Sequence, residues 1–216
     1  MVFGGPGRDR INGGIDDDLI NGEGDHDTLG GGDGNDTIYS QTDADAISGG
    51  PGDDRMFGGA GYDTLSGGDG NDFIQGSGGN DTLHGDAGND NLYESGDNVK
   101  NGGSGDDQLY GAGGDHTGNG DGGNDRIQSA GGRDDLDGGA GNDVRYGQND
   151  DTLNGGLGVD VLYGASGVDV LVGGDGDHNL QGATATTTSR ERTATISSQA
   201  ATARRSLRTG RQRCTC

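Results

Sequence analysis

The chain has 216 residues, of which 52 are glycine, 26% are hydrophobic and 4% are aromatic, so a conventional core of packed helices is excluded for lack of large apolar side chains. No apolar run is long enough for a transmembrane helix, and we expect no membrane insertion. The 14 basic and 37 acidic residues give a net charge of −23, which disfavours nucleic acid as a partner and favours a cation.

From Gly4 onward the sequence is a tandem repeat of nine residues. The first units read GGPGRDRIN, GGIDDDLIN, GEGDHDTLG and GGDGNDTIY, and residues 4–181 hold 18 full units and two units of eight residues. In the full units, position one is glycine in 16, position six is aspartate in 16, and position eight is isoleucine, leucine or methionine in 16. Such a repeat is typical of a solenoid, in which each unit adds one layer of structure.

Each repeat combines a tight turn with a very short strand. Glycines at positions one, two and four permit positive φ and close backbone approach, and positions seven to nine carry one dominant apolar side chain. Two repeats make one coil, so we predict an all-β fold, a parallel β-roll (β-solenoid) of roughly ten coils about 4.8 Å apart. The predicted inward ladders are Ile11, Leu29, Ile47, Leu65 and Leu83 on one face, and Ile20, Ile38, Met56, Ile74 and Leu92 on the other.

The aspartate at position six places one carboxylate at the end of every turn. Few apolar side chains are available to hold the coils, and the negative charge opposes compaction, so we expect a bound ligand that cancels this charge. Carboxylates and turn carbonyls offer only oxygen donors, which Ca²⁺ prefers, whereas Zn²⁺ prefers nitrogen or sulfur. We therefore predict several calcium ions between stacked turns, with Asp97 and Asp151 serving in the two shorter units.

The pattern GGxGxDxUx, in which U is a large apolar residue, resembles the RTX or haemolysin-type calcium-binding repeat. The best matches are GGDGNDTIY at 31–39, GGAGYDTLS at 58–66 and GGDGNDFIQ at 67–75, and the resemblance covers about residues 1–181. It implies an exported bacterial protein, with type I-like secretion, that folds on calcium outside the cell and carries a further domain. The metal ligands carried over to this sequence are Asp9, Asp18, Asp27, Asp36, Asp45, Asp54, Asp63, Asp72, Asp81, Asp90, Asp107, Asp125, Asp134, Asp143, Asp151, Asp160 and Asp169.

Composition and repeat fidelity divide the chain into four parts. Residues 1–93 form a regular roll, 94–119 are irregular repeats, and 120–181 continue the roll with a defect near 145–154. Residues 182–216 are rich in alanine, threonine, serine and arginine and lack aspartate, which predicts a disordered tail; a shifted reading frame is the alternative origin of this stretch.

Four residues break the repeat at positions six and eight. His116 and His178 replace the aspartate of position six, and Gly118 and Arg145 replace the apolar residue of position eight. We interpret these exchanges as decay of the repeat rather than as a site for a softer metal.

The first three residues fit positions seven to nine of a repeat. Met1, Val2 and Phe3 would then form the end of a unit, so we expect a fragment of a larger protein whose upstream domain is missing. At the other end, the spacing of Cys214 and Cys216 suits neither a disulfide for the roll nor a four-ligand zinc site.

The sequence contains no recognisable catalytic motif. Neither HExxH nor GxSxG occurs, and we do not expect an enzyme. The predicted function is that of a calcium-binding module that folds outside the cell. The alternative is a structural or adhesive surface protein whose roll itself binds cells or polysaccharide; an ice-binding version would need a regular threonine ladder, which Ala46 interrupts between Thr28 and Thr64.

Overall fold

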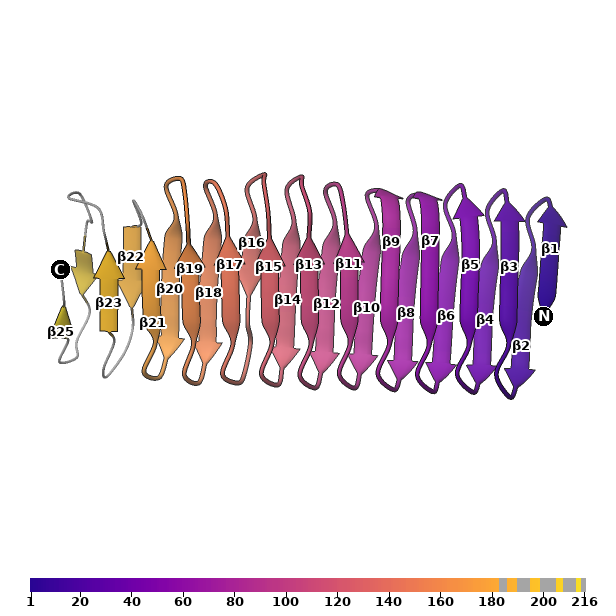
Figure 1. Ribbon diagram of the computed structural model, residues 1–216, viewed down its shortest axis with the longest axis horizontal. Helices are drawn as coiled ribbons and strands as arrows, with labels where there is room; N and C mark the ends of the chain where they lie inside the picture. The colour runs from indigo at the N-terminus through magenta and orange to yellow at the C-terminus, as the bar shows by residue number, and fades with distance from the viewer. Residues whose placement is uncertain (183–185, 190–194, 199–204, 208–212, 215–216) are drawn as a thin grey trace.

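The chain winds into a two-sided parallel β-solenoid, which confirms the predicted fold class (Figure 1). The structure is a computed structural model that describes residues 1–182, 186–189, 195–198, 205–207 and 213–214. Within these residues, odd-numbered strands form one sheet of 13 strands and even-numbered strands form a second sheet of 12. No helix in this part of the chain has the length and apolarity that a bilayer crossing needs.

The two sheets are assembled from strands of two to seven residues. The first sheet contains β1 (Val2–Pro6), β3 (Leu19–Gly24), β5 (Thr37–Thr42), β7 (Arg55–Gly61), β9 (Phe73–Gly79), β11 (Asn91–Glu94), β13 (Gln108–Gly111), β15 (Arg126–Ser129), β17 (Val144–Gly147), β19 (Val161–Gly164), β21 (Asn179–Gly182), β23 (Thr195–Ser198) and β25 (Arg213–Cys214). The second contains β2 (Arg10–Ile15), β4 (Thr28–Asp33), β6 (Ala46–Pro51), β8 (Thr64–Asp69), β10 (Thr82–Ala87), β12 (Val99–Ser104), β14 (Thr117–Gly122), β16 (Asp135–Asp137), β18 (Thr152–Leu157), β20 (Val170–Asp175), β22 (Thr186–Ser189) and β24 (Arg205–Leu207).

The strand register follows the repeat directly. Each strand pairs in parallel with the equivalent strand of the next coil, so that Ile20 lies beside Ile38, and Ile38 beside Met56. Where a unit has eight residues, the pairing still holds, and Leu83 lies beside Lys100. Strands β10 to β14 keep this pairing through the irregular segment, so the missing residue is absorbed in a turn and not in a sheet.

Apolar side chains at repeat position eight meet between the two sheets and form the core. Both predicted inward ladders are found there, with Ile11 only partly buried beside the first coil. Lys100, Gly118 and Arg145 take three of these core positions in place of an apolar residue. The buried apolar side chains are Ile20, Leu29, Ile38, Ile47, Met56, Leu65, Ile74, Leu83, Leu92, Leu109, Ile127, Leu136, Leu153, Leu162, Leu171 and Leu180.

An outer column of aromatic rings runs along the first sheet. Tyr39 stacks on Phe57 with ring centroids 4.8 Å apart, and Tyr93 stacks on Tyr110 at 4.9 Å. Phe73 joins the two pairs, at 5.7 Å from Phe57 and 5.3 Å from Tyr93. Because neighbouring rings of the stacked pairs cover one another's faces, the column stabilises the sheet rather than offering open faces for a ligand.

The described strands beyond Gly182 continue the two sheets. Strand β22 pairs with β20, and β23 pairs with β21. The residues between these strands lie outside the described part of the chain, so the disordered tail predicted for 182–216 stays a prediction.

Glycine at repeat position two is required by the close stacking of the turns. Gly68 has a φ of +112°, and a Cβ at this residue would overlap the carbonyl oxygen of Gly50 in the preceding coil. Both the backbone conformation and the space therefore exclude a side chain.

We expect Gly68→Ala to lower the free energy of unfolding by about 2 kcal/mol or more, through backbone strain and overlap. Gly30→Ala is the matched control, because a Cβ on Gly30 would have its nearest neighbour at 3.6 Å. The measurement is urea unfolding of both variants at saturating calcium. Equal effects of the two substitutions would contradict this account of the turn.

Candidate metal centres

The position-six side chains form two columns, one on each long edge of the solenoid where the chain crosses from one sheet to the other. The structure brings the 17 aspartates carried over from the RTX resemblance into these columns, and 15 of them are buried. The first edge holds Asp9, Asp27, Asp45, Asp63, Asp81, Asp134, Asp151 and Asp169, and the second holds Asp18, Asp36, Asp54, Asp72, Asp90, Asp107, Asp125, Asp143 and Asp160.

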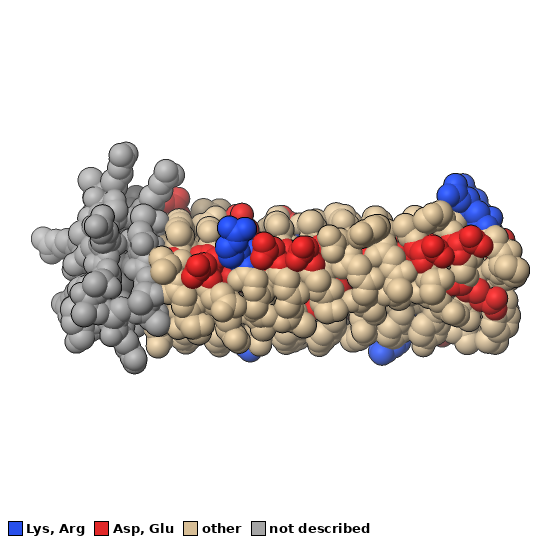
Figure 2. Space-filling view, turned by 90° about the horizontal axis from the view of Figure 1, so that it is seen from above, with Lys and Arg blue, Asp and Glu red and all other residues tan. Residues whose placement is uncertain are grey.

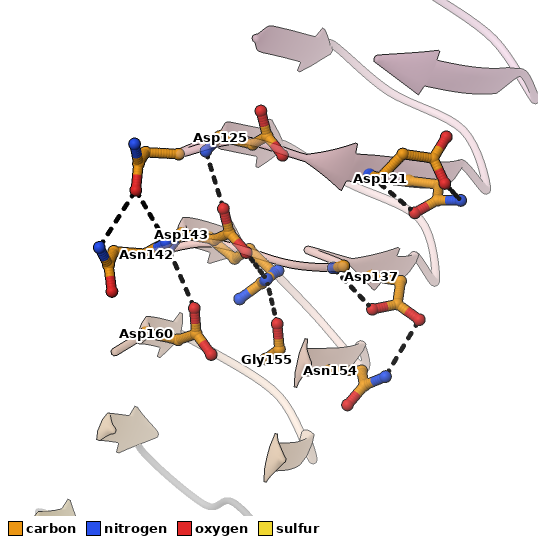
Figure 3. A network of polar contacts seen from close by, with 12 residues as sticks. Asp121, Asp125, Asp137, Asn142, Asp143, Asn154, Gly155 and Asp160 are labelled. Atoms are coloured by element: carbon orange, nitrogen blue, oxygen red, sulfur yellow. Dashed lines mark hydrogen bonds and ion pairs between the residues drawn. The ribbon is translucent and has the colours of Figure 1, made fainter. Parts of the chain in front are cut away.

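One carboxylate oxygen of each column aspartate from Asp27 onward links successive coils. The backbone N–H of Asp45 donates to Oδ1 of Asp63 at 2.9 Å, and the N–H of Asp63 donates to Oδ1 of Asp81 at 2.8 Å. Figure 3 shows the same ladder on the second edge, from Asp125 through Asp143 to Asp160. The turn of the preceding coil thus holds the short aspartate side chain in one orientation.

The second carboxylate oxygen is left without a protein partner. Oδ2 of Asp63 is buried and accepts no hydrogen bond. It lies 2.6 Å from the place a Cβ on Gly58 would occupy, and the carbonyl oxygen of Gly76 in the next coil lies 2.9 Å from that same place. We call such a space a cradle and name it by its position-one glycine. The Gly4 cradle is built alike, from Oδ2 of Asp9 and the oxygen of Gly22, each at 2.7 Å.

The cradles explain why repeat position one is glycine. A Cβ there would fill the space between the carboxylate and the carbonyl oxygen, and the same overlap recurs at Gly31, Gly49, Gly67, Gly85 and Gly120. Glycine at this position therefore keeps a small oxygen-lined space open in coil after coil.

Stacked buried carboxylates make the two edges electrostatically unfavourable without a cation. Burial raises the pKa of Asp63 to about 6 and that of Asp72 to about 7, because the ionised forms lose their hydration. Neighbouring carboxylates on the same edge raise both further, and the N–H from the preceding coil only partly offsets the effect. The pKa is also raised to about 6 for Asp54 and Asp90, and to about 7 for Asp107, Asp125 and Asp151.

Figure 2, which looks onto one long edge, shows acidic side chains in separate groups among other residues along the axis. Sixteen acidic side chains are buried inside the molecule, and 15 of them belong to the two aspartate columns.

The donor set fits a hard divalent cation. Within the described residues, no three histidine, cysteine, aspartate or glutamate side chains converge on one metal position, so each cradle depends on backbone oxygens besides its carboxylate. Carboxylate and carbonyl oxygens are the ligands that Ca²⁺ takes in flexible geometry. An ion held by the position-six aspartate and the glycine carbonyl of the next coil would neutralise the column and cross-link adjacent turns.

The irregular unit places Asn98, not Asp97, in the first-edge column. The side-chain oxygen of Asn98 accepts the N–H of Asp81, and Asn98 is buried. Asp97 is exposed and accepts the N–H of Asp115 at 2.8 Å. The sequence alone does not tell which turn residue an eight-residue unit lacks, and the missing residue here precedes the column position.

Sequence reasoning also missed Glu94, which brings a second carboxylate to the Gly76 cradle. Its Oε1 is buried without a hydrogen-bond partner and points into the space that Oδ2 of Asp81 also lines. Burial raises the pKa of Glu94 to about 7, and Asp81 raises it further. A carboxylate absent from position six at Asn98 is thus supplied from position one of the same unit.

Lys100 accompanies this exchange in the core. The side chain is 1% exposed, and its Nζ lies 3.4 Å from Nδ1 of His116. Gly118 lies beside Lys100 in the sheet, where an apolar side chain would otherwise stand. Glu94, Lys100 and Gly118 therefore compensate one another in charge and volume.

The two histidines keep their places in the columns. The backbone N–H of His116 donates to Oδ1 of Asp134 at 2.8 Å. The ring nitrogen Nδ1 of His178 accepts the backbone N–H of Asp160 at 3.2 Å. Burial lowers the pKa of His116. The ring nitrogen of His178 thus takes the place of a carboxylate oxygen in the ladder, whereas the imidazole of His116 faces Lys100.

A two-sided parallel solenoid with oxygen-lined cradles on both edges is a calcium-binding β-roll. The chain belongs to the RTX calcium-binding nonapeptide repeat family, whose model matches residues 1–29, 30–65, 66–93, 94–115, 117–144 and 146–177. Its cofactor is Ca²⁺, bound as several ions.

A solved structure supports the same conclusion. The chain is similar to a hyperactive, Ca²⁺-dependent, β-helical antifreeze protein from an Antarctic bacterium, with 25% identity and a TM-score of 0.74 over 87% of this chain and 70% of that one. No curated protein matches the chain.

Proposed function

We propose that this chain is a calcium-dependent folding module of an exported protein, unfolded where calcium is scarce and folded outside the cell. The observation that carries the proposal is the double column of buried carboxylates, most with an unpartnered Oδ2. Calcium would supply the charge that these columns lack and join each coil to the next. Membership of the RTX family and the Ca²⁺ dependence of the similar solved protein support this reading.

The calcium requirement follows from the balance between core and charge. The core is a single layer of side chains between two sheets, and it is interrupted by Lys100 and Arg145. Against it stand buried anions whose hydration is lost on folding. Extracellular calcium sites have Kd values of about 10⁻⁴–10⁻³ M, so filling would occur outside the cell and not in the cytoplasm.

The alternative, a surface protein whose roll itself binds cells or polysaccharide, has less support. The aromatic column is engaged in ring stacking. The outward column of the second sheet alternates between Thr28, Ala46 and Thr64, so it presents no uniform row of one side-chain type. We also expect no catalytic activity from the roll.

The proposal is tested by neutralising two neighbouring cradles. In Asp54→Asn with Asp72→Asn, the side-chain oxygens can still accept the ladder hydrogen bonds, as Asn98 does naturally. We expect about two fewer calcium ions per chain and a higher calcium concentration at the folding midpoint, because each altered cradle loses its only anionic ligand. Equilibrium dialysis counts the ions, and circular dichroism gives the midpoint.

The matched control is Asp33→Asn with Asp69→Asn. Both residues are exposed at position three of their repeats and lie outside the columns, so the net charge changes equally. The control should bind the same number of ions as the parent. If the column variant also binds as many ions as the parent, the position-six aspartates are not the ligands.

A further inference from the structure

Arg145 is the largest side chain fully buried in the described part of the solenoid. It lies on β17 at repeat position eight, is 0% exposed, and is flanked in the sheet by Ile127 and Leu162. An isolated guanidinium in an apolar core is strongly unfavourable, so this residue needs a specific compensating contact.

The guanidinium finds that contact at the second edge. Its Nη2 donates to Oδ2 of Asp143 at 3.0 Å and to the carbonyl oxygen of Gly155 at 2.7 Å. Figure 3 shows Gly155 beside Asp143, within the ladder of Asp125, Asp143 and Asp160. Arginine therefore joins a turn of one coil to the next coil.

The two acceptors are the pair that defines a cradle elsewhere. In the Gly58 cradle they are Oδ2 of Asp63 and the oxygen of Gly76. In the coil of Arg145 the corresponding glycine is Gly138, and Nη2 occupies the place where a Cβ on Gly138 would lie. The positively charged nitrogen thus stands inside the Gly138 cradle.

The electrostatic surroundings agree with a cation at this point. Burial lowers the pKa of Arg145, whereas Asp143 and then Asp160 raise it, and a guanidinium remains charged at neutral pH. Oδ2 of Asp143 has a hydrogen-bond partner, unlike Oδ2 of Asp125 in the neighbouring Gly120 cradle. Nε and Nη1 of Arg145 have none, so the bonds made by Nη2 are what hold the side chain inside.

We propose that Arg145 is an internal cation that replaces calcium in the Gly138 cradle. This inference rests on the proposed calcium-dependent folding, and it adds that one coil of the second edge is cross-linked without metal. The exchange at Arg145 is then a substitution of one cation for another, rather than the decay that the sequence pattern suggested.

The experiment is to restore the usual residue with Arg145→Leu and count bound ions. Leucine matches Leu162 in the next coil, and removing the guanidinium would free Oδ2 of Asp143 and the oxygen of Gly155. We expect about one more calcium ion per chain than the parent binds, measured by equilibrium dialysis at saturating calcium. Arg126→Leu is the control, because Arg126 is exposed and its substitution removes the same charge outside any cradle.

A second measurement uses the unaltered chain and does not depend on the variant folding. Anomalous X-ray scattering from calcium-loaded crystals should place ions at the Gly58 and Gly120 cradles and none at the Gly138 cradle. An ion at Gly138, or an unchanged count in a folded Arg145→Leu variant, would overturn the inference. If the parent binds no calcium at all, it is the proposed folding function that fails.

Discussion

Removing calcium near neutral pH is expected to unfold the solenoid, with loss of most of its β-type circular dichroism. Each site filled at about 100 times its Kd stabilises the folded chain by about 2.7 kcal/mol, and the cradles recur along both edges. A typical domain has a total free energy of unfolding of only about 5–15 kcal/mol, so losing several such contributions exceeds the margin. The measurement is a circular dichroism spectrum with and without chelator, followed by re-addition of calcium.

Magnesium provides the matched control for this result. It carries the same charge but demands near-octahedral geometry and retains water, so it suits a cradle of fixed carboxylate and carbonyl oxygens poorly. We expect an equal concentration of Mg²⁺ to restore little of the β signal. A spectrum that does not change on chelation would show that the core and the ladders suffice, and would refute calcium-dependent folding.

The fold could be predicted because the repeat is nearly invariant at its structural positions. An apolar residue at position eight, spaced by 18 residues, dictates an inward ladder, and Ile20, Ile38 and Met56 are in adjacent register. The aspartate columns follow from the same spacing. Neither result needed any knowledge of long-range packing, because in a solenoid each coil contacts mainly its neighbours.

The internal detail of the sites could not be predicted in the same way. The sequence places a carboxylate in each turn but does not say that Oδ1 accepts the N–H of another coil while Oδ2 stays unpartnered, as at Asp63. That division depends on the side-chain rotamer and on the separation of the coils.

The carboxylate of Glu94 was missed and the exchange at Arg145 was misinterpreted as decay for a different reason. Comparison of the repeats position by position treats each departure separately. The role of Glu94 depends on Lys100 and Gly118, and the role of Arg145 depends on Asp143. A charged residue at a core position was the available signal, because such a residue is retained only where a counter-charge meets it.

Acid should partly replace calcium in folding this chain. Folding raises the pKa of Asp63 to about 6 and that of Asp72 to about 7, both from an ordinary value of 3.8, chiefly through burial. Between the ordinary pKa and the raised pKa, the folded chain binds more protons than the unfolded chain. The stability of the metal-free roll therefore falls as the pH rises and grows as the pH falls. Ionisation of these carboxylates therefore destabilises the metal-free roll near neutral pH, and protonation removes that cost.

We therefore expect the calcium-stripped protein to be unfolded at about pH 7.5 and to gain β structure as the pH is lowered to about 5. Circular dichroism measures the β structure, and light scattering excludes aggregation. Calcium affinity should rise over the same interval with increasing pH, because protons and calcium compete for one set of oxygens. Replacing Asp54, Asp72 and Asp90 by asparagine should make the metal-free roll less sensitive to pH, since these positions then cannot ionise. A stripped chain that stays unfolded at about pH 5 would mean that calcium does more than neutralise the columns, namely that its bonds to carbonyl oxygens are needed to hold one turn against the next.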